Sequence, residues 1–468
     1  MKSIQATHKT LALLVVLASI VYFESYAFDV LAYHGPFTAR YLSIHDLDIS
    51  GYNDYLTNRY NGFPAFWRLA LYPALFLNIH RLIILPNILA LIILLVTCKL
   101  TIKLNYALTC LAIFINPITL YLFRSGYQDF FVSSSIVSAF ILIIYGINEL
   151  SLKKITLSLG LLVIVSMTKY QGYSQSIIII LIGFLYAILS LRHKKRQLSM
   201  VTAVALIGAM LCSLHVIYNL FSFENPFFPV NIGPFNGPEQ NYDDAPTYIS
   251  LIWPLSNILN HFASATELDW IFRGVIPNYS LDMHRSQMQF GGIIDNHQSQ
   301  TLLRTGGTYG PAYLFTLIAF CLILFKKYLK NATRLFREYP NKSFSDLFLF
   351  SAIFVLLISI LPQSHELRYY LSSLILPNIL VACFINKSSG FKSIEIVYIV
   401  LILISFSVNF IQPLSTTAKV FKTHGSLEYL INYPIRDLPS SSQCLDSFSI
   451  PELVNPSEFA CLLRKKNL

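Results

Sequence analysis

The sequence predicts an all-α membrane protein whose chain crosses the bilayer about eleven times. Three observations support this prediction: 54% of the 468 residues are hydrophobic, only 12% are charged, and the mean hydropathy is +0.56. A soluble domain carries roughly 25% charged residues, about twice the share found here. The charges also gather in short tracts between long apolar runs, because each span needs ~20 apolar residues.

The apolar runs give the order of the expected spans. They lie near residues 10–28, 82–98, 105–123, 130–148, 155–168, 176–191, 200–221, 309–325, 345–362, 369–385 and 393–411. The segment 63–79 is apolar but contains Arg68 and Pro73, which favours an interfacial or partly re-entrant helix in the first outer loop. The first run follows Lys9 and is expected to be an uncleaved signal anchor, because no convincing small-residue cleavage site precedes Asp29.

The distribution of charge predicts the orientation. With the N-terminus inside, the inner loops hold 18 of the 34 Lys and Arg residues and four of the 24 acidic residues, an excess of 14 positive charges. The outer segments hold the other 16 basic and 20 acidic residues, an excess of four negative charges. Because basic residues on short loops favour retention in the cytoplasm, the net charge of +10 indicates topology and not nucleic-acid binding. The basic stretch 192–197 is expected to contact anionic membrane lipids.

This orientation divides the chain into two parts. Residues 1–411 form a transmembrane domain with outer loops at 29–81 and 222–308, and residues 412–468 form a small outer tail. Cys444 and Cys461 lie in this tail, and a short loop in an oxidising compartment predicts a disulfide between them. The alternative is a pair of free thiols buried against the membrane domain.

Unusual polar side chains gather on the expected outer side. They are Asp29, Tyr33, His34, Asp129, Lys169 and Arg368. An ionised carboxylate at the membrane boundary normally has a role or a partner, whereas a lone lysine at a helix end is equally well explained by snorkelling. Cations that hold a phosphate and a carboxylate that takes a proton from a hydroxyl are suited to a reaction on a phosphate-bearing lipid. No metal-ligand spacing and no Gly-rich phosphate loop is present, so ATP-driven transport by this chain alone is not expected.

Several short segments resemble motifs of the bacterial membrane glycosyltransferases of the GT-C class, relatives of the protein mannosyltransferases and the lipid A aminoarabinose transferase. FDVLAYHGP, which contains Asp29, Tyr33 and His34, resembles the Asp-x-x-x-Tyr-His-x-Pro signature after the first span. Later matches follow in the family's order over residues 8–385: GYQDFF, TKYQG, ENPFFPVNI, LRTGGTYGP and LRYYL. In ENPFFPVNI, Glu224 stands where the family has Gly, and LRTGGTYGP has one extra residue.

The resemblance implies transfer of a sugar from a polyprenyl-phosphate donor to an envelope glycan, lipid or protein, on the outer face of a bacterial inner membrane. Asp29 would then be the catalytic carboxylate that acts on the acceptor. Tyr33, His34, Asp129 and Arg304 would bind substrate, and Lys169 and Arg368 would bind the lipid phosphate. Asp129 matches an acidic turn that helps to hold a divalent metal, Mg²⁺ or Mn²⁺, in some relatives. The first loop has a single Asp in place of the Asp-Glu pair of the mannosyltransferases, which weakens the expectation of a metal.

Two other functions agree with the same composition. A lipid-linked glycan flippase or other transporter would be expected to have internal repeats or broken helices at mid-membrane, and no convincing repeat is seen. An O-antigen-type glycan polymerase or ligase is also polytopic with a large outer loop, but it lacks the Asp signature after the first span.

Overall fold

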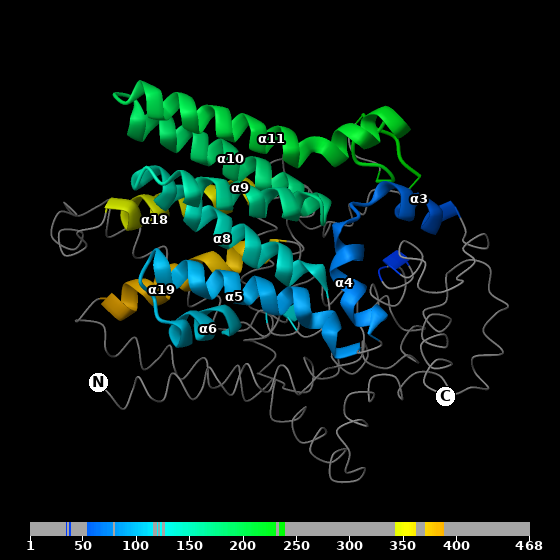
Figure 1. Cartoon of the computed structure of the whole chain (residues 1–468), viewed down its shortest axis with the longest axis horizontal. Helices are drawn as coiled ribbons and strands as arrows, with labels where there is room; N and C mark the ends of the chain where they lie inside the picture. Colours follow the sequence, from blue (N-terminus) through cyan, green and yellow to red (C-terminus); the bar gives the residue numbers. More distant parts are fainter. Residues whose placement is uncertain are drawn as a thin grey trace, which may run out of the picture.

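The described part of the chain, in a computed structural model, is a bundle of α-helices without a β-strand (Figure 1). The structure describes residues 34, 37–38, 54–77, 80–115, 119, 122–123, 127–230, 234–238, 342–361 and 370–387. Four of its helices are long and apolar enough to cross a membrane, which makes the chain a membrane-embedded helical protein. The expected spans 10–28, 309–325 and 393–411 and the tail 412–468 lie outside the described residues.

The helices follow the order of the apolar runs. They are α3 (Asp54–Gly62), α4 (Phe66–Phe76), the 3-10 helix η2 (His80–Ile84), α5 (Leu85–Leu100), α6 (Tyr106–Phe114), α8 (Gln128–Asn148), α9 (Leu152–Ser166), α10 (Tyr170–Leu191), α11 (Lys195–Phe223), α18 (Lys342–Ser359) and α19 (Ser372–Lys387). Four expected spans coincide with the four membrane-capable helices, which are α5 with η2, α8, α10 and α11. The shorter helices α9, α18 and α19 occupy three further expected spans.

The span expected over 105–123 differs from the helix observed there. α6 begins after Asn105, whose Oδ1 accepts a hydrogen bond from the backbone N–H of Leu108 at 2.8 Å, and it ends at Phe114. Its nine residues rise about 14 Å, roughly half of the hydrocarbon core. The sequence explains this early end, because Pro117 disfavours the helical conformation at the residue before it.

Helix α8 is the centre of the bundle. Every residue from Gln128 to Ile147 is buried, and α8 packs against α5, α9, α10, α18 and α19. Gly183 of α10 permits a close approach, because a Cβ there would come within 2.5 Å of the Ile143 side chain of α8. α11 lies at the edge of the bundle (Figure 1), where apolar side chains such as Leu206 and Phe221 are exposed. A buried central helix with apolar faces outside it is the arrangement expected of a bundle surrounded by lipid.

The bundle has two ends with different polar contacts. At the first, the site end, α8 and α10 begin and α9 and α11 end; α3 and α4 lie beyond it, to the right in Figure 1. At the second, the opposite end, the Tyr186 hydroxyl lies 2.5 Å from both Asn148 Oδ1 and Asp346 Oδ2. These two contacts join α10 to α8 and to α18.

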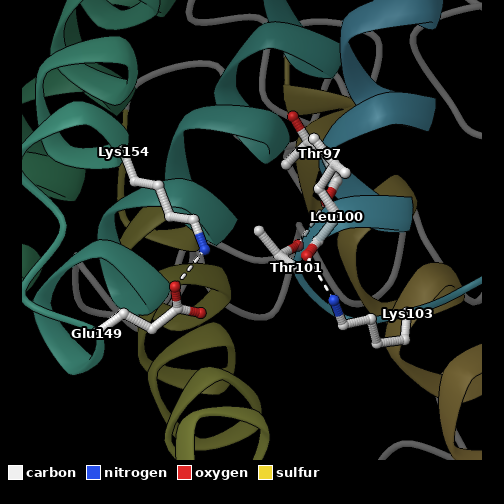
Figure 2. Close-up of polar contacts among 6 residues, drawn as sticks. All are labelled: Thr97, Leu100, Thr101, Lys103, Glu149 and Lys154. Carbon is white, nitrogen blue, oxygen red and sulfur yellow. Dashed lines mark hydrogen bonds and ion pairs between the residues drawn. The ribbon is translucent and has the colours of Figure 1, made fainter.

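Two lysines make simple surface contacts at the opposite end (Figure 2). Lys154, in the first turn of α9, pairs at 2.5 Å with Glu149, the C-cap residue of α8. The Lys103 ammonium donates to the backbone oxygen of Leu100 at 3.2 Å, at the end of α5. A cation at a helix C-terminus is stabilised by the helix dipole and by the free carbonyls there.

Candidate functional site

The site end contains a buried ion pair. The Lys169 ammonium donates to Oδ1 of Asp129 at 2.5 Å; the carboxylate side chain is 2% exposed and the lysine side chain 13%. Asp129 lies in the first turn of α8, where the helix dipole favours a carboxylate. Lys169 is the extended N-cap residue of α10. Because a buried charge is tolerated only when it is paired, each residue holds the other in place.

His34 lies near this pair. Burial lowers the pKa of His34 well below 6.5, and the positive charges of Lys169, Arg68 and Arg59 lower it further. His34 is therefore neutral at pH 7, with one ring nitrogen as a donor and the other as an acceptor. The Thr38 hydroxyl donates to the backbone oxygen of His34 at 2.7 Å, which holds this part of the first loop.

Arg68 closes the turn between α3 and α4. Its buried guanidinium donates to the carbonyl oxygen of Tyr60 and, at 3.4 Å, to that of Phe63. It also lies over the rings of Tyr60, at 4.3 Å, and Phe37, at 5.4 Å. The sequence presented Arg68 as an interruption of an apolar segment, but α4 continues through it and through Pro73. The arginine instead ties the helix to the preceding turn through bonds that its planar fork is shaped to make.

A second polar cluster, the Gly62 hub, lies next to Lys169 and consists of Gly62, Tyr170, His215, Asn219 and Phe228. The carbonyl oxygen of Gly62 lies 2.6 Å from the Tyr170 hydroxyl, 2.7 Å from His215 Nε2 and 3.0 Å from Asn219 Nδ2. The Tyr170 hydroxyl lies 2.5 Å from the carbonyl oxygen of Phe228, and Asn219 Nδ2 donates to that hydroxyl at 2.6 Å. The hub thus joins the end of α3, the start of α10, the end of α11 and the loop that follows.

The loop after α11 is folded by the side chain of Asn225. Its Oδ1 accepts from the backbone N–H of Phe227 at 2.8 Å, and its Nδ2 donates to the carbonyl oxygens of Val230, at 2.9 Å, and Asn236, at 3.2 Å. Glu224, the C-cap of α11, has a left-handed backbone with φ 55° and ψ 14°. That conformation favours glycine, the residue that the resembling motif has at this position.

The structure describes three of the predicted site residues and brings two of them into contact. Lys169 and Asp129 form an ion pair, and His34 lies near enough to Lys169 for the positive charge of the lysine to lower the pKa of His34. The other predicted residues lie outside the described part of the chain: Asp29, Tyr33, Arg304, Arg368, Cys444 and Cys461.

The sequence analysis gave no role to Tyr170, which lies in the matched segment TKYQG, or to His215 and Asn219. A signal for two of them was present, because His215 and Asn219 are four residues apart and so share one face of an apolar span. Polar and ionisable side chains are rare in such spans and normally have a partner or a function.

The described residues do not suit a divalent metal. Oδ1 of Asp129 receives the Lys169 ammonium, whose charge would repel a metal ion at that oxygen. Within the described ranges no group of three His, Cys, Asp or Glu side chains gathers to bind one. The metal that the resemblance suggests therefore has no built site in this part of the chain, and the chemistry proposed below uses none.

Comparisons with known proteins give no match, whether to a protein family, to a curated protein or to a solved structure. The class that the fold defines is a helical membrane protein. Its distinguishing feature is a buried charged site at one end of the bundle.

Proposed function

We propose that this chain is an integral membrane glycosyltransferase that moves a sugar from a polyprenyl-phosphate donor to a cell-envelope acceptor. The observation that carries the proposal is the buried Lys169–Asp129 pair, with neutral His34 nearby, at one end of a bundle of membrane-capable helices. Chemistry on a lipid-linked substrate requires charged groups at the membrane boundary, and ionisable groups there are commonly functional. The segments that contain these three residues also resemble GT-C motifs in the family's order.

In this proposal the chain crosses the membrane about eleven times, with the N-terminus in the cytoplasm and the tail outside. The site end of the bundle then lies at the outer face of the membrane. The exposed basic residues 192–196 lie at the opposite end, as retention in the cytoplasm requires. Reporter fusions at Lys195 and Asn341 should therefore read cytoplasmic, and a fusion after Ser426 should read periplasmic. A cytoplasmic reading after Ser426 would change the number of spans and remove the outer assignment.

The proposed chemistry assigns each charge a task. A glycosidic bond forms between the acceptor oxygen and the sugar carbon as the bond from that carbon to the donor phosphate breaks. The phosphate leaves with the bonding electrons, and Lys169 and Arg368 are assigned to stabilise its charge. Asp29 is assigned as the general base that takes the proton of the acceptor hydroxyl. Asp129 holds the Lys169 ammonium in position before the donor arrives.

Mass spectrometry of lipid-linked sugars and surface glycans tests the proposal in a strain that lacks the chain. One polyprenyl-phosphate sugar should accumulate, and one sugar residue should be missing from an envelope glycan, lipid or protein. Complementation with Lys169→Gln should leave the accumulation in place. Lys154→Gln is the matched control, because it removes a lysine paired with a carboxylate at the opposite end. Unchanged lipid-linked sugars and an intact envelope in the deletion strain would contradict the proposal.

A further inference from the structure

We propose that Tyr170, His215 and Asn219 are positioning residues for the charged site. Through the Gly62 hub they fix the turn between α9 and α10, so that the Lys169 ammonium stays on Asp129. The inference rests on the proposed function for its catalytic meaning, and the contacts that carry it stand independently of that function.

The turn between α9 and α10 is held from two sides. Lys169 has an extended backbone, with φ −159° and ψ 146°, and successive side chains of an extended segment point in opposite directions. The Lys169 side chain reaches Asp129 on α8. The next side chain, Tyr170, reaches Gly62 at the end of α3 and Phe228 in the loop after α11. Movement of Tyr170 would therefore move the lysine attached to it.

Every donor hydrogen of the hub can be assigned to an acceptor. A carbonyl oxygen only accepts, so Nε2 of His215 carries a proton and donates to Gly62. The single hydroxyl hydrogen of Tyr170 is shared between two acceptors, the Phe228 oxygen at 2.5 Å and the Gly62 oxygen at 2.6 Å. One amide hydrogen of Asn219 goes to the Tyr170 oxygen at 2.6 Å, and the other reaches Gly62 at 3.0 Å. Each of these four hydrogens has an acceptor, which holds the three side chains in one arrangement, although Asn219 Oδ1 is buried without a hydrogen-bond partner among the described residues.

The backbone on the far side of the hub is also closely packed. A Cβ at Gly62 would lie 2.5 Å from the carbonyl oxygen of Phe228, so only glycine permits this approach. The α3–α4 turn is tied to α9 as well, since the backbone N–H of Phe66 donates to the oxygen of Met167 at 3.0 Å. Tyr170 therefore bonds to a fixed surface and not to a loose loop.

Joining α10 to α11 does not by itself require the hub. One turn further along α10, the Tyr173 hydroxyl lies 3.4 Å from Ser213 Oγ on α11 and makes a simple link between the same two helices. The hub uses a histidine and an asparagine inside an apolar span, where polar groups are costly. The hub lies one residue from Lys169, whose ammonium has to be positioned on Asp129.

The rate of acylation of Lys169 tests the inference on the full chain in detergent. An amine-reactive acylating reagent, read out by peptide mass spectrometry, modifies an amine more slowly when a carboxylate holds it. Asp129→Asn gives the rate of Lys169 in the absence of the Asp129 carboxylate. Tyr170→Phe should raise the Lys169 rate at least about fivefold over the native chain, because it removes a hydroxyl that both donates and accepts hydrogen bonds in the hub, and fivefold is the effect of losing one such bond. Lys154, at the opposite end, should keep its rate in every variant and serves as the internal reference (Figure 2).

Two sets of variants separate positioning from general stability. Tyr173→Phe removes a tyrosine hydroxyl that reaches α11 outside the hub, and it should leave the Lys169 rate unchanged. His215→Gln keeps a donor and should stay near the native rate, whereas His215→Leu should resemble Tyr170→Phe. The comparison of His215→Gln with His215→Leu tests the positioning role even if Tyr170→Phe does not fold.

Equal Lys169 rates in the native chain, Tyr170→Phe and His215→Leu would overturn the inference. A similar rise in Tyr173→Phe would overturn it as well, because the effect would then be general loosening. Raised rates in the hub variants together with unchanged lipid-linked sugars in cells would support the positioning role and count against glycosyl transfer.

Discussion

Lys169 and Asp129 are 40 residues apart in the chain, yet the ammonium group of one lies 2.5 Å from the carboxylate of the other. The pair joins the start of α10 to the first turn of α8, the helix at the centre of the bundle. Lys169 is thus an oriented cation and not a lysine that extends freely into the headgroup region. The stability and the proposed chemistry of the site end depend on this contact.

Breaking the pair from one side should be more harmful than removing it completely. Asp129→Asn or Lys169→Met removes one charge of the ion pair and leaves the other charge buried, which costs about 3–5 kcal/mol. The double variant Asp129→Asn, Lys169→Met leaves no charge, so it should lose less stability than the sum of the single variants, by at least about 1 kcal/mol. Chemical unfolding in detergent measures these differences. Strict additivity would show that the two side chains do not interact in the folded protein.

His34 should make the stability of the site end depend on pH. Burial, and then the charges of Lys169 and Arg68, hold the pKa of His34 well below 6.5 in the folded chain, whereas the unfolded chain has the ordinary value. Between these two values the unfolded chain binds the extra proton, so the free energy of unfolding rises with pH there. The contribution is complete above about pH 6.5 and is lost as the pH falls toward the folded value.

The melting temperature in detergent should accordingly fall between about pH 7 and about pH 5, and His34→Gln should show a smaller fall. His193, which is exposed at the opposite end, provides the control variant His193→Gln. If His34→Gln and the native chain respond to pH identically, other groups cause the response.

Glu224→Gly should stabilise the chain. The left-handed backbone of Glu224 costs a residue with a Cβ about 1 kcal/mol, and glycine adopts it without strain. The added flexibility of glycine in the unfolded chain offsets part of the gain, so the expected increase in unfolding free energy is a few tenths to about 1 kcal/mol. Glu224→Ala removes the same carboxylate but keeps the Cβ, and it should not stabilise. Equal gains in both variants would assign the effect to the charge.

The tail should contain a disulfide between Cys444 and Cys461. The other five of the seven cysteines lie in the expected spans, where cysteine is a small apolar side chain. Under denaturing conditions without reductant, a thiol-reactive polymer should therefore shift the protein by five additions, and by seven after reduction. Seven additions without reductant would rule the bond out.

The sequence predicts the four membrane-capable helices of the described part, because the requirement of the bilayer is local. The apolar runs of α5, α8, α10 and α11 can be recognised within ~20 residues each. α6 is shorter than its apolar run suggests, although Pro117 marks the point before which its helix had to end.

The site was predictable only in part, because its contacts depend on packing. Charge and sidedness placed Asp129 and Lys169 on one side of the membrane, but their direct pairing depends on how α8 and α10 meet. The Gly62 hub was harder still, since two of its acceptors are the backbone oxygens of Gly62 and Phe228. A backbone acceptor has no signature in the residue type, so the donors Tyr170, His215 and Asn219 had no visible partners in the sequence.

The most direct test of the account uses the purified chain in lipid discs with the lipid-linked sugars that accumulate in the deletion strain. With an envelope extract as acceptor, we expect mass spectrometry to show one polyprenyl-phosphate sugar converted to free polyprenyl phosphate as the acceptor gains one sugar. Lys169→Gln should slow this conversion, Asp29→Asn should reduce it by roughly 10²-fold or more, the contribution of a general base, and Lys154→Gln should leave it unchanged. If the native chain leaves the lipid-linked sugars intact, or if Asp29→Asn and Lys169→Gln convert them as fast as the native chain, the proposed glycosyl transfer at this site is wrong.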